Sequence, residues 1–172
     1  MAVAQNLSNS LVLACTYILI AMGLNMVYGV LKVLHIAHAG VYVFGAFIGV
    51  TTYAKLTPLL VAGALSRAGA SNLAFWISLV VGMLAAGILG VLIYQFVYRY
   101  TWRKSPTVSL VAAVGMFILI QDLLQKPFFL GARQSAYPAA GAGLPRIETP
   151  WFYLTSMQVL ILVVTLALLA VV

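Results

Sequence analysis

Long apolar runs separated by short polar interruptions make up nearly the whole chain. A hydrocarbon core of about 30 Å needs about 20 helical residues. An open strand in lipid would leave its backbone hydrogen bonds unsatisfied. The pattern therefore predicts an all-α, polytopic integral membrane protein with about five hydrophobic segments. These segments are residues 11–30, 36–54, 73–98, 107–124 and 151–172.

An unusual polar interruption lies within the stretch Met22–Gly49. Lys32, His35 and His38 stand there between two strongly apolar runs, without the polar cluster of an ordinary loop. This pattern predicts a broken helix near residues 29–40. A helix break at membrane depth survives only where it is buried in protein or lines a watery cavity. Such breaks mark binding sites in transporters.

Composition supports a membrane protein. The 172 residues are 65% hydrophobic and 6% charged, with a mean hydropathy of +1.13, whereas soluble domains are about 25% charged. Nine basic residues oppose two acidic ones. Because the basic residues fall between apolar runs, we interpret them as anchors at anionic lipid headgroups rather than as a nucleic-acid surface. The single cysteine, Cys15, is expected to be a buried, inert thiol.

Small residues recur every four positions in two of the predicted spans. Gly45 and Gly49 form one such stripe, and Gly82, Ala86 and Gly90 form another. Small residues let helix backbones approach closely in lipid. We therefore expect both stripes to be helix-packing faces.

The limits of the spans follow from local signals. Lys55 and Pro58 predict the end of the second helix, and the residues from there to 72 are expected to form a loop with a short interfacial helix. Ser71-Asn72 is a candidate N-cap for the next span. Near the end of the fourth span, Asp122 and Lys126 have the i, i+4 spacing of a structural ion pair.

Enzyme chemistry finds little support in the sequence. The chain contains no GxxxxGK[ST] or GxGxxG motif, so we expect no bound nucleotide and no cofactor. His35 and His38 could be two metal ligands, but a zinc site needs further ligands, and only Cys15, Asp122 and Glu148 are available. We assign no metal site and no catalytic residue.

Two ordered motifs carry a resemblance to a known family. The stretch GLNMVYGVLKVLHIAHAGVYVFGAF at 23–47 resembles the opening signature of the permease subunits of branched-chain amino acid ABC importers. The stretch SLVAAVGMFILIQ at 109–121, with Tyr98-Arg99 before it, resembles a second family segment. The family's Asn, Phe and Gly-Glu pair correspond here to His35, Ile36 and Ala39-Gly40.

The resemblance implies a transporter subunit in the cell inner (plasma) membrane, crossing it several times. It would form the pathway for branched-chain or related small amino acids, with separate ATPase chains, a periplasmic substrate-binding protein and a second permease subunit as partners. We interpret residues 1–172 as a single transmembrane permease domain that is incomplete at its C-terminus. The alternative is an ATP-independent channel, a secondary transporter or a structural membrane subunit with the same apolar scaffold.

The break is the predicted substrate site. If residues 33–40 begin a half-helix near the membrane midplane, its N–H groups suit the carboxylate of an amino acid. His38 and Tyr42 would flank that carboxylate, with His35, Asn25 and Gln121 as neighbours. An interhelical hydrogen bond is the alternative role for His38, and pairing with a neighbouring helix is the alternative for Asn25.

Overall fold

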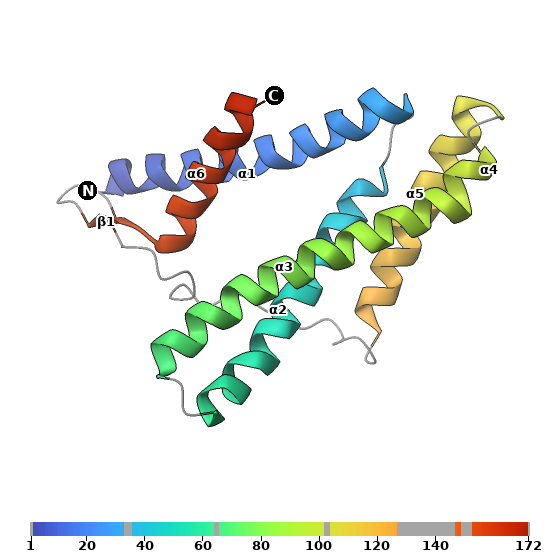
Figure 1. Ribbon diagram of the computed structural model, residues 1–172. Coiled ribbons are helices and arrows are strands. Elements are labelled where there is room, and N and C mark those ends of the chain that lie inside the picture. Colours follow the sequence, from blue (N-terminus) through green and yellow to red (C-terminus); the bar gives the residue numbers. More distant parts are fainter. Residues whose placement is uncertain are drawn as a thin grey trace.

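A computed structural model describes residues 2–32, 36–63, 66–101, 104–126, 147–148 and 153–171. Within these ranges, four helices are long and apolar enough to cross a membrane, and a fifth apolar helix is shorter. Figure 1 shows α2 and α3 side by side, α5 beside their upper end and α6 across α1. The prediction of an all-α membrane protein with about five hydrophobic segments is confirmed.

The first two helices are separated by the predicted break. Helix α1 covers Ala2–Leu31 and helix α2 covers His38–Ala62. Lys32 has a positive φ of 51°, and its N–H donates to the carbonyl of Tyr28 at 2.8 Å. This left-handed conformation ends α1. The break is confirmed, but it is narrower than predicted, and positions 33–35 lie outside the described residues.

Helix α2 continues through the proline that was expected to end it. Pro58 lies inside the helix, which ends only at Ala62. A proline removes one intrahelical hydrogen bond, but α2 stays packed on both sides of Pro58. The Tyr53 hydroxyl forms a hydrogen bond with the Ser71 hydroxyl of α3 at 2.6 Å, and Leu60 packs against the buried cluster of Tyr53, Ala74 and Phe75. The expected loop and interfacial helix are therefore wrong, since the helices on either side take up most of that segment.

Helix α3 begins earlier than predicted, at Arg67, and runs to Ile93. Ser66 has an extended backbone, and its side chain accepts from the Gly69 N–H at 3.3 Å. Ser66 is thus the N-cap residue. The assignment of the cap to Ser71-Asn72 is wrong because Ser71 already lies within the helix.

A π-helical segment, η1 (Tyr94–Tyr98), follows α3 and leads into the short α4 (Arg99–Thr101). Residues five apart in an α-helix lie about 140° apart around its axis. The wider π turn reduces this angle. Ile93 and Tyr98 can therefore both be buried, at 2% and 3% exposure, in the same cluster.

The small-residue stripes of α2 and α3 face each other, and we call this contact the α2–α3 seam. A Cβ atom added to Gly82 would lie 2.8 Å from the carbonyl oxygen of Gly45, and one added to Gly45 would lie 2.8 Å from the Cβ of Ala86. The predicted packing face is confirmed for these residues. It is wrong for Gly90, where an added Cβ would have no neighbour within 4 Å among the described residues.

Helix α5 (Pro106–Gln125) has a well-defined start. The Ser105 side chain accepts from the Val108 N–H at 3.4 Å, and proline occupies the first helical turn, where its missing N–H costs nothing. At the other end, Lys126 Nζ lies 3.3 Å from Asp122 Oδ2, and both side chains are exposed. The predicted ion pair is confirmed.

The last described elements pack back on the first helix. Strands β1 (Ile147–Glu148) and β2 (Tyr153–Leu154) form an antiparallel pair, followed by α6 (Ser156–Val171). The Gln5 side chain of α1 accepts from the Tyr153 N–H at 2.9 Å and donates to its carbonyl at 3.1 Å. α1 also supplies the buried free thiol of Cys15, as predicted.

Candidate functional site

The start of α2 lies against α1. His38 is the first residue of α2 and is half-buried. A Cβ atom added to Gly23 of α1 would lie 2.8 Å from His38 Nε2 and 3.0 Å from Cε1. The absence of a side chain at Gly23 therefore makes the space that the imidazole occupies. We call this contact the α1–α2 junction.

Helix α5 covers another side of the α2 start. A Cβ added to Gly40 would lie 3.2 Å from Ile120 Cδ1. Ile120 belongs to a buried cluster with Ile93 and Tyr98, against which the partly buried Ile36 of the break also packs. Ile36 and the first turn of α2 thus make apolar contacts with α5 and the end of α3, while His38 faces α1.

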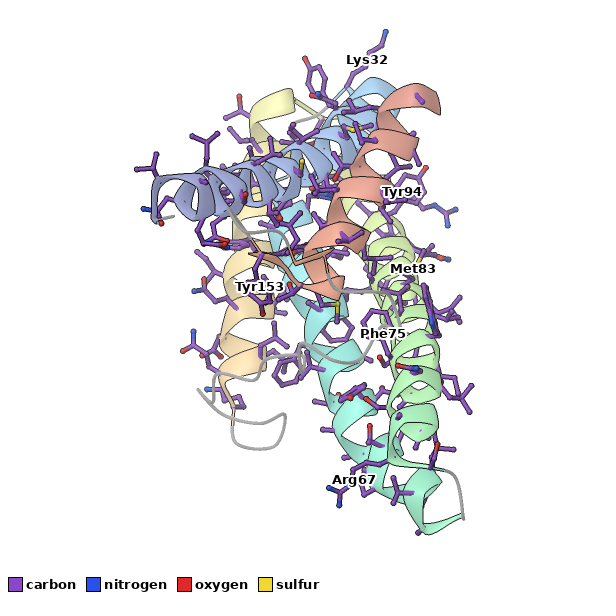
Figure 2. All side chains as sticks on the ribbon, turned by 90° about the vertical axis from the view of Figure 1, so that its left-hand side faces the viewer. Lys32, Arg67, Phe75, Met83, Tyr94 and Tyr153 are labelled. Carbon is purple, nitrogen blue, oxygen red and sulfur yellow. The ribbon has the colours of Figure 1, made fainter. Side chains whose placement is uncertain are left out.

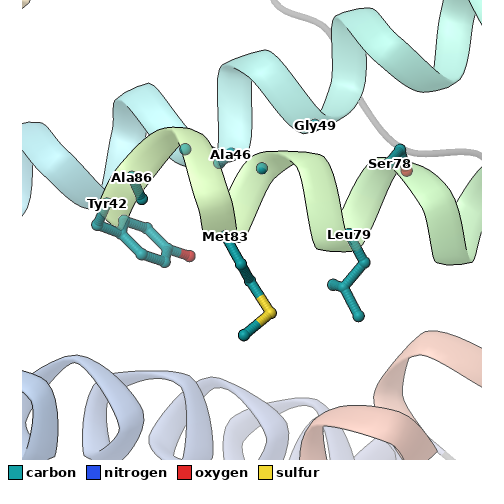
Figure 3. Close-up of a pocket in the computed structure, with 9 residues that line it drawn as sticks. Tyr42, Ala46, Gly49, Ser78, Leu79, Met83 and Ala86 are labelled. Carbon is teal, nitrogen blue, oxygen red and sulfur yellow. The ribbon is translucent and has the colours of Figure 1, made fainter. Parts of the chain in front are cut away.

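Tyr42, one turn after His38, points in the same general direction, because side chains four residues apart share a helix face. Its side chain is 48% exposed. It lines a cavity of about 310 Å³ between α2 and α3, shown in Figure 3. Two predicted site residues, His38 and Tyr42, therefore lie on one face of α2.

The other predicted site residues are less closely associated. Asn25 follows Gly23 by two positions on α1, and its side chain is exposed. Gln121 follows Ile120 on α5 and is also exposed. His35 lies outside the described residues. For these three residues, a role in a substrate pathway stays a prediction.

The N-terminus of α2 has no side-chain cap. Ala37 occupies the N-cap position and makes no side-chain hydrogen bond. Figure 2 shows Lys32 at one end of the bundle and Arg67 at the opposite end. Helix α1 has 30 residues and α2 has 25, and each is long enough to cross the hydrocarbon core alone. The half-helix start at the midplane therefore stays a prediction.

No metal site is found in the part of the chain that the structure describes. No group of three or more His, Cys, Asp or Glu side chains comes together there. The chemistry that the junction offers is hydrogen bonding, from the His38 imidazole and the Tyr42 hydroxyl.

Two kinds of residue near the candidate site were not predicted from the sequence. Gly23 was seen only as part of the family motif, although it makes the space for His38. Leu79 and Met83, which line the cavity beside Tyr42, were seen only as apolar residues of a span. Leu79 and Met83 are four residues apart, and each lies three positions before a seam residue, Gly82 or Ala86. This helical spacing could have placed them near the seam.

Comparisons with known proteins agree with the helical membrane fold. Residues 6–172 match the family described as Branched-chain amino acid transport system / permease component. Among curated relatives, the high-affinity branched-chain amino acid transport system permease protein LivH of Escherichia coli (strain K12) is 29% identical over 174 residues, 96% of this chain and 52% of LivH. No solved structure matches the chain significantly.

Two further relatives agree. LivH of Salmonella typhimurium is 29% identical over the same shares of both chains. The permease protein BraD of Pseudomonas aeruginosa is 29% identical over 164 residues, 94% of this chain and 50% of BraD. The chain thus spans about half the length of the curated relatives that it matches.

The fold and its apolar helices define a polytopic α-helical membrane protein. Since the family match covers nearly the whole chain, the protein belongs to the family of permease components of branched-chain amino acid transport systems. The family resemblance predicted from the two sequence motifs is confirmed.

Proposed function

We propose that this chain is the permease subunit of an ABC importer in the cell inner membrane, where it forms the translocation pathway for branched-chain or related small amino acids. The observation that carries the proposal is the family match over residues 6–172. As the family resemblance implies, energy would come from separate ATPase chains. A second permease subunit and a periplasmic substrate-binding protein complete the proposed assembly.

The α1–α2 junction is the proposed substrate contact. Its support is geometric: His38 begins a helix whose N-terminus lacks a side-chain cap, and uncapped N–H groups favour an anionic group nearby. The Ala39 N–H already donates to the Ile36 carbonyl at 3.3 Å, so a substrate carboxylate would accept from the other N–H groups of the first turn, with the His38 imidazole and the Tyr42 hydroxyl beside it. His35, Asn25 and Gln121 are proposed as outer residues of the same pathway.

Reconstitution tests this function. The chain is purified with the second permease subunit, the ATPase chains and the binding protein, and uptake of labelled leucine into liposomes is measured. We expect uptake that requires both ATP and the binding protein. Leucine flux through the permease alone, without ATP, would favour the alternative channel or secondary transporter. Copurification without any ATPase chain would also contradict the proposal.

A further inference from the structure

The cavity beside Tyr42 lies in the crease between α2 and α3 and faces α1 and α6 (Figure 3). Its floor consists of small residues of the seam, including Gly45, Gly49 and Gly82. Glycines allow the two backbones to meet, but they bring no side chains to fill the crease. Close packing of the two helices thus leaves an open groove on the side toward α1.

The lining of this groove is apolar. Leu79 and Met83 stand at its rim, with 37% and 67% of their side chains exposed. The buried hydroxyl of Ser78 donates to the Phe75 carbonyl at 2.8 Å and is thus engaged within α3. Placing a charged group on such a surface is costly. The groove therefore suits an aliphatic group.

The volume of the groove is compatible with a small occupant. Ligand pockets in proteins range from about 300 to 1,000 Å³, and this cavity, at about 310 Å³, is at the lower end. That volume suits a solute of amino-acid size. The small residues themselves serve helix packing, because Gly82 contacts Gly45 at the α2–α3 seam.

The groove continues from the proposed substrate contact. His38, Tyr42, Ala46 and Gly49 are spaced at four, four and three residues along α2, so they share one face. His38 lies at the α1 end of this face, and the other three line the groove. The site thus has a polar end at His38 and an apolar groove beside it. An amino acid has the same arrangement, with a carboxylate next to an aliphatic side chain.

We propose that this groove holds the aliphatic side chain of the transported amino acid, and that Ala46, Leu79 and Met83 determine the largest side chain accepted. The inference rests on the proposed function and adds the residues that select substrates by size. One methylene group in an apolar pocket changes discrimination about 10-fold or more. Filling or widening the groove should therefore shift substrate preference strongly.

The first test fills the groove. Ala46 is exposed and lines the cavity, so Ala46→Leu adds a side chain where the aliphatic group would lie. In the assembled importer, we expect the leucine-to-alanine uptake ratio to fall at least about 10-fold. Ala54→Leu is the matched control, because Ala54 is also exposed on α2 but does not line the groove. The control should leave the ratio unchanged.

The second test widens the groove. It keeps the proposal testable if Ala46→Leu fails to fold. Met83→Ala removes a side chain that is 67% exposed, and its neighbour Leu84, 62% exposed and outside the lining, provides the control Leu84→Ala. We expect Met83→Ala to raise the phenylalanine-to-leucine uptake ratio about 10-fold, and Leu84→Ala to leave it unchanged. An unchanged ratio in both Ala46→Leu and Met83→Ala would overturn the proposal.

A binding test separates failure of this proposal from failure of the proposed function. Cys15 is the only thiol in the chain and is buried, so maleimide labelling of Ala46→Cys reports the groove without any need for transport. We expect leucine to slow that labelling and to leave Ala54→Cys unaffected. Equal rates with and without leucine would overturn the groove proposal even if the importer transports leucine. Protection without ATP-dependent uptake would instead contradict the importer function alone.

Discussion

Two contacts of equal closeness differ in what they allow. At the α2–α3 seam, a Cβ on Gly82 would lie 2.8 Å from the Gly45 carbonyl oxygen. At the α1–α2 junction, a Cβ on Gly23 would lie 2.8 Å from His38 Nε2. The first obstacle is backbone, which moves only if a helix moves. The second is the far end of a side chain, which can rotate. The same distance therefore marks a fixed contact in one place and an adjustable contact in the other.

The surroundings increase this difference. The seam runs along two long helices and is reinforced by the Tyr53–Ser71 hydrogen bond at 2.6 Å. The junction lies beside a break whose Lys32 has a left-handed backbone. Such a conformation costs a non-glycine residue about 1–2 kcal/mol. We expect the seam to govern folding and the junction to govern transport.

Gly82→Leu should have the largest effect. Its side chain would force the backbones of α2 and α3 apart, and overpacking of this kind costs about 3 kcal/mol. We expect the assembled complex to be lost in detergent, as measured by size-exclusion chromatography. Gly90→Leu is the control, since a Cβ added to Gly90 would meet no atom of the described part of the chain within 4 Å. Normal assembly of Gly82→Leu would remove the distinction between seam and junction.

His38→Ala should act on transport instead. Removing the imidazole takes away the polar group proposed beside the substrate carboxylate, and we expect leucine uptake to fall at least about 10-fold, equivalent to 1.4 kcal/mol. The amount of assembled complex should not change. If assembly is lost or uptake is normal, His38 has a structural role and makes an interhelical contact only.

Gly45→Ala is a milder change at the seam. The new methyl would meet Ala86 Cβ at 2.8 Å and the Gly82 carbonyl oxygen at 3.1 Å, so we expect a loss of about 1–3 kcal/mol in unfolding free energy. Adding Ala86→Gly removes the closer contact and should restore part of the loss. A double variant no more stable than Gly45→Ala in thermal unfolding would show that Ala86 is not the obstacle.

Gly23→Ala should fold normally and reduce uptake only a few-fold, because the methyl displaces the His38 ring rather than backbone. The decisive measurement is a double-mutant cycle with His38→Ala, since contacting residues give non-additive effects. In the His38→Ala background, Gly23→Ala should change uptake no further. Additive losses would mean that Gly23 acts independently of His38.

Asp122→Asn should have the smallest effect. Its ion pair with Lys126 is exposed, and exposed pairs contribute between about 0 and 1 kcal/mol. We expect unchanged assembly and uptake, with an unfolding temperature within error of the unmodified chain. A clear loss of transport would add Asp122 to the functional residues, because an ionisable group in a span can serve a pathway.

Much of the fold could be predicted because its signals are local. Apolar runs of helical length identified the spans, and the small-residue spacing identified Gly45, Gly82 and Ala86 as a packing face. Helix limits were less predictable. Pro58 and Ser71 carry ordinary stop and start signals, yet both lie inside helices. Beyond Pro58, α2 still packs on α3 through Leu60, and α3 is already capped by Ser66 before Ser71.

The site was predictable in part, for the same reason. The histidines and the interrupted apolar pattern indicated a break, and His38 with Tyr42 could be placed on one face from their spacing alone. Gly90 was wrongly grouped with Gly82, since each step of four residues turns about 40° around a helix, so that a stripe of this spacing leaves the contact face after two steps. Which helix would face His38 also had no local signal.

The sequence by itself determined that this chain is a helical membrane protein, where its helix is interrupted and to which family it belongs, because hydropathy, periodicity and motifs are properties of neighbouring residues. Only the tertiary structure decided that Gly23 makes room for His38, that Gly45 meets Gly82, and that Met83 stands over an open groove. Those relations join residues far apart in the chain. They depend on how the helices cross, which no single helix encodes.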